Sequence, residues 1–301
     1  MDIIEIDGKT RPDGTKVALC LGNFDGLHLG HQELLLTARK SDYLPSILLF
    51  EPSAEALLFP ERPHPVLTSL EDKLRILPRY GIELAYVLRA DLSFYALDPR
   101  GFVSFLKEKI DPSLIVCGTD FRFAKNCEGN PSLLREAFPT VELPLLQKGG
   151  EKVSSTRIRR LIMEEGDVKA ATSLLGRLYE MKGSVHHGLH NGTRIGFPTL
   201  NLLPSAPYCY PLNGVYEGVS YLSGMAYRSI INVGTNPTVG ALSAPQVESH
   251  LLGFEGDAYG KTLYVSFERR LRGEKKFGSL AELQKQIEHD KEAVLRGEEE
   301  E

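Results

Sequence analysis

The stretch VALCLGNFDGLHLGH, residues 17–31, joins an apolar run to a glycine-rich turn and then to a helical pattern. The apolar run at 17–21 predicts a buried strand, and the amphipathic pattern at 31–39 predicts a helix. Glycines let a backbone turn sharply and approach a phosphate, and the N–H groups at a helix N-terminus attract an anion. We therefore expect a phosphate-binding site in this turn.

The rest of the first half repeats this alternation of apolar strands and amphipathic helices. Further buried strands are predicted at 46–50, 84–88 and 114–117, and helices at 69–79 and 101–110. Continuous apolar strands separated by helices indicate a parallel sheet that is covered on both faces. Ligands of such a sheet bind at the carboxyl ends of its strands, which is where the turn at 22–31 lies.

The pattern changes at about residue 178. Segments with period-two alternation, separated by turns rich in Gly, Pro and Asn, follow at 215–221, 227–233, 247–252 and 263–267. They predict the strands of an antiparallel barrel or sandwich. A final helix is expected at 279–295, with its apolar residues on roughly one face. The fold class is therefore α/β, with a Rossmann-like parallel-sheet domain at 1–178 and an antiparallel β domain with a closing helix at 179–301.

Composition narrows the class of protein. The length of 301 residues favours about two domains, and 35 basic against 40 acidic side chains give a formal charge of -5. This charge offers no general attraction to nucleic acid or to an anionic membrane. The four cysteines lack CxxC spacing, the N-terminus is not a signal peptide, and no apolar run approaches the length of a membrane span. We expect a soluble, cytoplasmic protein with reduced cysteines.

His28 and His31 are the candidate chemical residues of the turn. Histidine can donate hydrogen bonds to phosphate oxygens whose negative charge grows in a transition state, without becoming a covalent nucleophile. The alternative interpretation is a glycine-rich turn with two solvent-exposed histidines. The position of the HxGH sequence between a strand and a helix favours the functional interpretation.

A second cluster of hydroxyls and charges begins a predicted helix at residue 154. Ser154, Ser155 and Thr156 can cap the helix or bind phosphate oxygens, and Arg159 could stabilise a departing pyrophosphate. Taken alone, an ordinary capped helix with solvated arginines is the better interpretation. Another helix is expected to follow Asp167 and to run to about residue 175.

Three motifs taken together, GNFDGLHLGH at 22–31, GTDFRFA at 118–124 and SSTRIR at 154–159, resemble a known family. They are similar to the adenylyltransferase half of bacterial bifunctional riboflavin kinase/FAD synthetases, within the HxGH nucleotidyltransferase superfamily. The resemblance implies that the FMN phosphate attacks the α-phosphorus of ATP directly and that pyrophosphate leaves. It also implies that His28 and His31 stabilise the transferring phosphate while Ser155, Thr156 and Arg159 hold the other two.

By the same resemblance, the remaining motif residues contribute to the two substrate sites. The ATP and phosphate site would include Gly22, Asn23, Phe24, Asp25, Gly26, Gly30 and Ser154. Asp120, Phe121 and Phe123 would line the flavin side, since aromatic rings offer a stacking surface to an isoalloxazine. For either phenylalanine alone, a place in the core at a strand end is as good an interpretation.

The second half holds a separate candidate site. Glycines at 183, 188, 192 and 196 suit a loop over ATP phosphates, and Pro198 introduces a strand on which Thr199 and Asn201 share one face. One hydroxyl and one amide oxygen, with ATP oxygens and water, would suit Mg²⁺. A polar strand face without function is an equally good interpretation of these residues alone.

The motifs of this half resemble riboflavin kinase in order and spacing. They are GFPTLN at 196–201, NVGTNPT at 232–238, VESH at 247–250 and LRGEKKF at 271–277. The resemblance implies a six-stranded antiparallel barrel, an ATP site that includes Gly183, Gly188 and Gly192, and a magnesium or other divalent cation on Thr199 and Asn201. Glu248 would be the general base for the ribityl 5′-hydroxyl. A solvated glutamate on a barrel strand is the alternative.

Three positions depart from the family pattern. Ala124 stands where glycine is usual, Asn130 where aspartate is common, and Leu200 where alanine is usual. The first two bear on the shape of the FMN loop, whereas Leu200 is expected to affect packing alone.

Other functions are compatible with parts of the sequence. A flavin-binding carrier without turnover would not need the histidines, Thr199, Asn201 and Glu248. An HxGH enzyme for pantetheine phosphate or nicotinamide nucleotide does not explain the second half, and a tRNA-charging enzyme conflicts with the acidic balance. The expected partners are therefore small molecules, namely riboflavin, FMN and ATP, while the oligomeric state is open.

Overall fold

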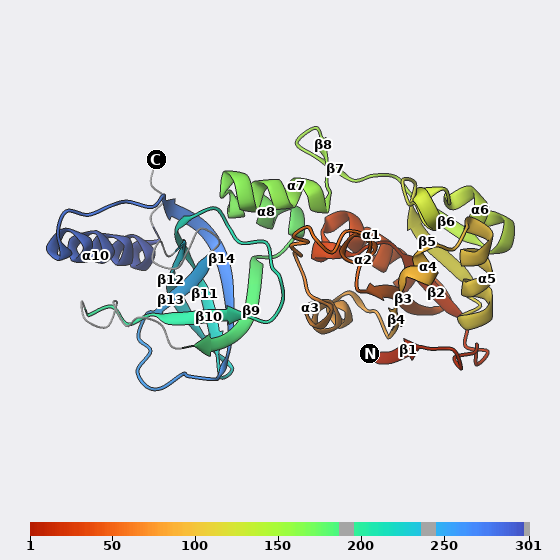
Figure 1. Ribbon diagram of the computed structural model, residues 1–301, viewed down its shortest axis with the longest axis horizontal. Coiled ribbons are helices and arrows are strands. Elements are labelled where there is room, and N and C mark those ends of the chain that lie inside the picture. Colours follow the sequence, from red (N-terminus) through yellow and green to blue (C-terminus); the bar gives the residue numbers. More distant parts are fainter. Residues whose placement is uncertain (187–195, 236–244, 298–301) are drawn as a thin grey trace. The chain divides into compact units, whose positions relative to one another are not determined.

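The computed structural model describes residues 1–186, 196–235 and 245–297 (Figure 1). The chain divides into two compact units, Met1–Ser155 and Thr156–Glu301. The predicted boundary at residue 178 thus lies some twenty residues beyond the division between the compact units. The two units are described in turn.

The first unit is built on a six-stranded parallel sheet with the order β1-β4-β3-β2-β5-β6. In chain order its strands are β1 Asp2–Ile6, β2 Val17–Leu21, β3 Leu44–Glu51, β4 Leu84–Arg89, β5 Leu114–Gly118 and β6 Thr140–Leu143. The four predicted strands are present as β2 to β5, and all five residues of β2 are buried. The parallel sheet predicted from the apolar runs is confirmed.

Helices cover both faces of this sheet (Figure 1). Leu19 and Leu21 of β2 pack with Phe102 on one face, and Ala18 and Cys20 pack with α1 on the other. This alternation follows from the period of two along a strand.

The helices and 3-10 turns of this unit are η1 Asp25–Leu27, α1 Leu29–Arg39, α2 Ala54–Leu58, α3 Leu70–Ile76, η2 Leu77–Tyr80, α4 Leu92–Tyr95, α5 Pro99–Lys109, η3 Lys125–Cys127 and α6 Pro131–Ala137. A short hairpin, β7 Gln147–Lys148 with β8 Glu151–Lys152, precedes residue 154.

The second unit contains a closed antiparallel barrel with the order β10-β13-β12-β11-β14-β9. Its strands are β9 Tyr179–His186, β10 Leu200–Pro204, β11 Gly214–Leu222, β12 Met225–Gly234, β13 Gln246–Leu251 and β14 Thr262–Arg272. The predicted antiparallel barrel is therefore confirmed, and the alternative of a sandwich is wrong. Small buried side chains such as Ser220 and Ser249, whose hydroxyl oxygens lie 2.9 Å apart, occupy part of its interior.

Helices flank the barrel on its outer surface. The final helix α10, Leu280–Arg296, begins at the Ser279 cap and packs Val294 against Val215 and Ile230. Before the barrel come α7 Ser155–Arg160, the π-helical segment η4 Leu161–Glu165 and α8 Val168–Leu175. The α8 helix contacts β14 and β9. This packing explains why the compact second unit begins well before residue 178.

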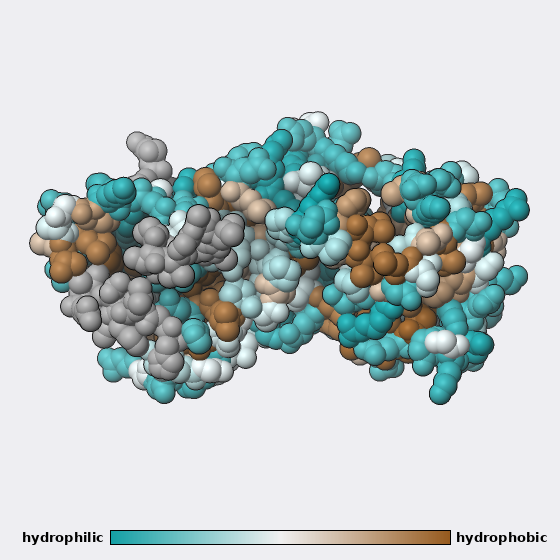
Figure 2. All heavy atoms as spheres, viewed as in Figure 1, coloured by the Kyte–Doolittle hydropathy of each residue, from teal (hydrophilic) through white to brown (hydrophobic). Residues whose placement is uncertain are grey.

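Polar residues dominate the face shown in Figure 2, and smaller apolar patches lie among them. Over the described ranges, no helix combines the length and apolar character that a membrane crossing requires.

Candidate functional sites

The turn after β2 has an unusual backbone. Phe24 and Leu27 have positive φ values of 50° and 43°, and Gly26 lies between them at 79°. Side chains other than glycine rarely adopt this region, so the surrounding contacts must hold the turn. Phe24 and Leu27 are both fully buried, and their packing supplies that constraint.

Asp25 anchors this turn through its carboxylate. The Leu67 and Thr68 amides each donate a hydrogen bond to Asp25 Oδ1 at 3.0 Å. The Gly26 amide donates to Thr68 Oγ1 at 2.9 Å. Asp25 is only 8% exposed, so its carboxylate holds the loop from the buried side. Thr68 was not predicted from the sequence, because it lies 43 residues beyond Asp25 and only the fold brings the two together.

His28 and His31 come together at the start of α1, as their spacing predicts. His28 is the N-cap of the helix, and its Nδ1 accepts a hydrogen bond from the His31 amide at 3.3 Å. The two imidazole rings are stacked with 3.7 Å between centroids. Because Nδ1 accepts, a neutral His28 carries its proton on Nε2, which can donate to a ligand oxygen. A Cβ at Gly30 would lie 3.3 Å from the His28 ring, so glycine provides the room for this arrangement.

The SSTRIR segment reaches the same turn through one residue. Ser155 Oγ donates a hydrogen bond to the Asp25 carbonyl at 2.8 Å. Ser154 is half-buried beside it, whereas Thr156 and Arg159 belong to the second compact unit. Within α7, Ser155 and Arg159 are four residues apart and so share one helix face.

The predicted flavin residues follow β5, the strand next to β2. Phe123 is 6% exposed, and its ring packs 4.7 Å from that of Phe102 in the core. Phe121 is half-buried, with its ring 5.7 Å from Phe123. Asp120 is half exposed and forms an ion pair with Lys152 of β8. Phe123 thus packs in the core, and Lys152 is a neighbour of Asp120 that sequence reasoning missed.

The departures from the family pattern have clear structural settings. Ala124 has φ 64° and ψ -176°, a region that is essentially reserved for glycine. Asn130 is the N-cap of α6, and its Oδ1 accepts a hydrogen bond from the Ser132 amide at 3.0 Å. Asparagine therefore performs the capping role that aspartate could perform, while alanine introduces strain.

In the second unit, the candidate base and metal ligands meet on neighbouring strands. Asn201 of β10 lies opposite Glu248 of β13 in the ladder, and Thr199 Oγ1 donates to Glu248 Oε2 at 3.4 Å. Burial raises the pKa of Glu248 above its usual value, and the Thr199 hydrogen bond opposes this shift only in part. The barrel therefore places one carboxylate beside two neutral oxygen donors.

The glycines predicted for the ATP loop have separate settings. Gly183 lies within β9, opposite Pro204 in the ladder, and a Cβ there would be 2.1 Å from the Leu203 carbonyl oxygen. Its lack of a side chain thus permits close strand pairing. Gly188 and Gly192 lie outside the described residues.

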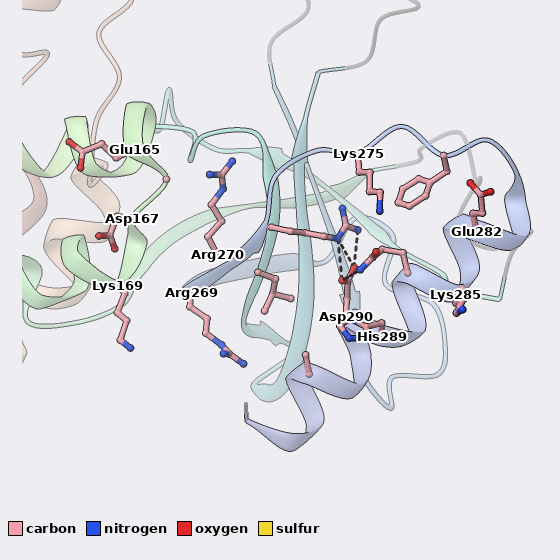
Figure 3. A pocket seen from close by; sticks show the side chains of 16 residues that line it. Glu165, Asp167, Lys169, Arg269, Arg270, Lys275, Glu282, Lys285, His289 and Asp290 are labelled. Carbon is pink, nitrogen blue, oxygen red and sulfur yellow. Dashed lines mark hydrogen bonds and ion pairs between the residues drawn. The ribbon is translucent and has the colours of Figure 1, made fainter. Parts of the chain in front are cut away.

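A cavity of about 1120 Å³ lies in the second unit between β14, α10 and the turn before α8 (Figure 3). The Arg272 guanidinium forms an ion pair with the buried Asp290 carboxylate, with Nη2 2.8 Å from Oδ2. Figure 3 shows Lys275, Lys285 and His289 around this pair. Among the described residues, its lining includes none of the positions predicted from the sequence for either site.

Comparison with known proteins identifies the relatives of both units. Residues 10–157 match the FAD synthetase family model, and residues 175–296 match the riboflavin kinase model. The bifunctional riboflavin kinase/FMN adenylyltransferase of Bacillus subtilis is 32% identical over 95% of this chain and 94% of its own length. Its Escherichia coli K12 counterpart is 35% identical over 90% of each chain.

A solved structure shows the same architecture. A crystal structure from Streptococcus pneumoniae, described as a macrolide-efflux protein, superposes with a TM-score of 0.89 at 30% identity. The match covers 98% of this chain and 99% of the other. This likeness supports the fold over both units.

Proposed function

The chain belongs to the bifunctional riboflavin kinase/FMN adenylyltransferase family, and we propose that its first unit carries the adenylyl transfer and its second unit the kinase reaction. The protein phosphorylates riboflavin to FMN and joins FMN to the adenylyl group of ATP, giving FAD. The matched regions, 10–157 and 175–296, support this division of the two activities.

For adenylyl transfer, the proposed roles follow from charge. The nucleophile is an FMN phosphate oxygen that is already ionised at neutral pH, so no general base is required. Charge develops on the α-phosphate oxygens of ATP as the new bond forms. His28 and His31 donate hydrogen bonds to these oxygens, and the α1 N-terminus adds its positive end. Asn23, Phe24, Asp25 and the glycines of the turn shape the pocket in which this occurs.

The pyrophosphate leaving group is assigned to the start of α7. Ser155, already hydrogen bonded to the turn, would present this segment to the β- and γ-phosphates. Thr156 and Arg159 would complete the contacts, the guanidinium by charge-assisted hydrogen bonds. Asp120 and Phe121 would contact FMN at the carboxyl end of β5, next to β2.

For the kinase reaction, Glu248 is the proposed general base. It would accept the proton of the ribityl 5′-hydroxyl as that oxygen attacks the γ-phosphorus and ADP leaves. Burial raises its pKa, which makes the carboxylate a better proton acceptor than a solvated one. Positioning of the two substrates supplies most of the remaining rate.

The oxygen donors beside Glu248 fit a hard divalent cation. Thr199 supplies a hydroxyl and Asn201 an amide carbonyl, and Mg²⁺ favours such oxygens together with phosphate and water. When bound, magnesium would neutralise charge on the ATP phosphates. The chain's own contribution is to fix both donors on one side of the base.

One observation carries the kinase assignment: the hydroxyl of Thr199, the residue just before β10, contacts the Glu248 carboxylate, and Asn201 of β10 lies opposite Glu248 in the ladder. The test is to incubate the full-length protein with riboflavin, ATP and magnesium and to separate the flavins over time. FMN should appear first and FAD afterwards, with one pyrophosphate released for each FAD. Unchanged riboflavin would contradict the kinase proposal, and FMN that never becomes FAD would contradict the adenylyltransferase proposal.

A further inference from the structure

A row of polar residues crosses three neighbouring barrel strands at the level of Glu248. Asn201 of β10 lies opposite Glu248 of β13, and Glu248 in turn lies opposite Asn232 of β12. Directly opposed residues of antiparallel strands project to the same face, about 5 Å apart. The order across the barrel surface is therefore Asn201, Glu248, Asn232.

Burial shows that this row faces the outside of the barrel. The residues flanking Glu248, Val247 and Ser249, are buried, and so are Ile231 and Val233 on either side of Asn232. Asn232 itself is exposed. Within the described ranges, its side-chain carboxamide forms no hydrogen bond with another residue. A carboxamide in this position is available to a ligand.

The two sides of Glu248 differ in chemistry. The Thr199 and Asn201 donors, assigned to the ATP-bound cation, lie on the β10 side. In phosphoryl transfer the attacking and leaving oxygens are roughly in line with phosphorus, so the acceptor approaches from the side opposite the donor nucleotide. The side of the base opposite β10 is β12, where Asn232 is the outward residue at this level.

We propose that Asn232 determines acceptor specificity by hydrogen bonding a hydroxyl of the polyol chain of riboflavin, close to the hydroxyl that attacks. This inference rests on the proposed role of Glu248. A carboxamide both donates and accepts, so it matches a hydroxyl in either orientation. Its distance of one strand spacing from the base places that hydroxyl within a few bonds of the reacting oxygen.

The surroundings of Asn232 keep this wall of the site polar. The Glu274 carboxylate packs over Gly234, where a Cβ would be 2.6 Å from Oε1 and 3.6 Å from the Asn232 amide nitrogen. Asn213 Nδ2 donates to Glu274 Oε2 at 3.2 Å. Glycine at 234 thus lets a hydrogen-bonded carboxylate lie beside Asn232, which suits a ligand that carries several hydroxyls.

The test is a comparison of acceptors on the full-length protein. The kinase kcat/KM is measured for riboflavin and for its 2′-, 3′- and 4′-deoxy analogues, with the parent protein, Asn232→Ala and Gln246→Ala. Gln246 is the matched control, because it is an exposed carboxamide on the same outer face of β13 whose ladder partner is Gly234. Conversion of supplied FMN to FAD by each variant reports on folding.

We expect Asn232→Ala to lower kcat/KM for riboflavin roughly tenfold, the size of one lost hydrogen bond. With one of the three deoxy analogues, the one that lacks the hydroxyl bound by Asn232, the kcat/KM values of the parent and of Asn232→Ala should agree within a factor of about two. Gln246→Ala should stay within about twofold throughout.

An equal loss with every acceptor, or no loss with riboflavin, would overturn the inference. A matching loss in Gln246→Ala would also overturn it, since the effect would not be specific to Asn232. Glu248→Gln separates the two levels of the proposal. If Glu248→Gln abolishes kinase turnover but the loss in Asn232→Ala is the same for every acceptor, only the inference fails. If it retains turnover, the base assignment fails and the inference fails with it.

Discussion

The Ser155 hydroxyl donates a hydrogen bond to the main-chain carbonyl of Asp25, across 130 residues of sequence. Asp25 also accepts hydrogen bonds from the Leu67 and Thr68 amides. The start of α7 is therefore tied to the turn that carries His28 and His31. Residues from three distant parts of the chain therefore hold this turn in place.

We expect Ser155→Ala to lower the rate of FAD formation from FMN about fivefold to tenfold, since one hydrogen bond contributes roughly 1 kcal/mol. Thr37→Ala is a matched control, because its hydroxyl also donates to a main-chain carbonyl, that of Glu33, but on the exposed surface of α1. Steady-state rates with supplied FMN measure both. Equal rates for Ser155→Ala and the parent would show that the Asp25 contact does not organise the site.

His28→Ala and His31→Ala should each greatly slow FAD formation while riboflavin is still converted to FMN. Removing one donor to a developing oxyanion costs roughly 2.7 to 4 kcal/mol, or about a hundredfold to a thousandfold in rate. His64→Ala, whose Nε2 contacts the Phe59 carbonyl on the exposed surface, is the control. Normal FAD synthesis by both variants would remove these histidines from the mechanism.

Ala124→Gly should stabilise the first unit. Alanine at φ 64° and ψ -176° is strained by about 1 to 3 kcal/mol, and glycine removes this cost while adding some entropy to the unfolded chain. We expect a net gain of about 1 kcal/mol in the free energy of unfolding, measured by urea denaturation. An unchanged or lower value would mean that the loop around Ala124 is not strained.

The sequence was most informative where one physical signal dominates. The apolar runs of β2 and β4 each predict a strand that the structure contains, and the helices expected after Asp167 and from residue 279 are present as α8 and α10. The edge strand β1 was missed because it is short, its DIIEI sequence does not alternate strictly, and three of its five residues are exposed. It is held by main-chain pairing to β4. Gly183 was predicted in a loop, but close strand pairing explains it better.

The sites were less predictable, because they depend on tertiary register. Nothing near Asp25 in the sequence identifies Thr68, and nothing near Glu248 identifies Asn232 as its ladder partner. These relationships arise only when strands and loops are placed side by side. Motif spacing predicts the local chemistry, whereas the neighbours of each chemical group follow from the fold.

The second unit should function alone, and its stability should depend on where the fragment begins. A fragment of residues 177–301 lacks α8, whose buried Val168, Leu174 and Leu175 belong to a helix that contacts β14 and β9. A fragment of residues 156–301 retains it. We expect both to phosphorylate riboflavin, and the shorter one to lose about 2 to 5 kcal/mol in unfolding free energy. Equal stability would show that α8 contributes nothing to the barrel, and a folded fragment without kinase activity would show that the site needs the first unit.

The sharpest prediction concerns Glu248, because its proposed role is a single proton transfer. Glu248→Gln keeps the shape of the side chain and can still accept the Thr199 hydrogen bond, but it cannot take a proton at neutral pH. The kinase rate should fall roughly a hundredfold or more, and ATP binding should survive. Rates of FMN formation from riboflavin and of FAD formation from supplied FMN are measured on one preparation.

These two rates must separate if the assignment is right. The adenylyl transfer uses a phosphate that is already ionised, so it needs no base and should stay near the parent rate. A global folding defect would lower both rates together, so the second rate is an internal control. Glu180→Gln is a matched substitution on β9, where the Glu180 carboxylate accepts a hydrogen bond from Ser266 at 3.1 Å, and it should leave both rates within about twofold. A kinase rate for Glu248→Gln within a factor of about two of the parent would make Glu248 a structural residue, and the base would have to be sought elsewhere.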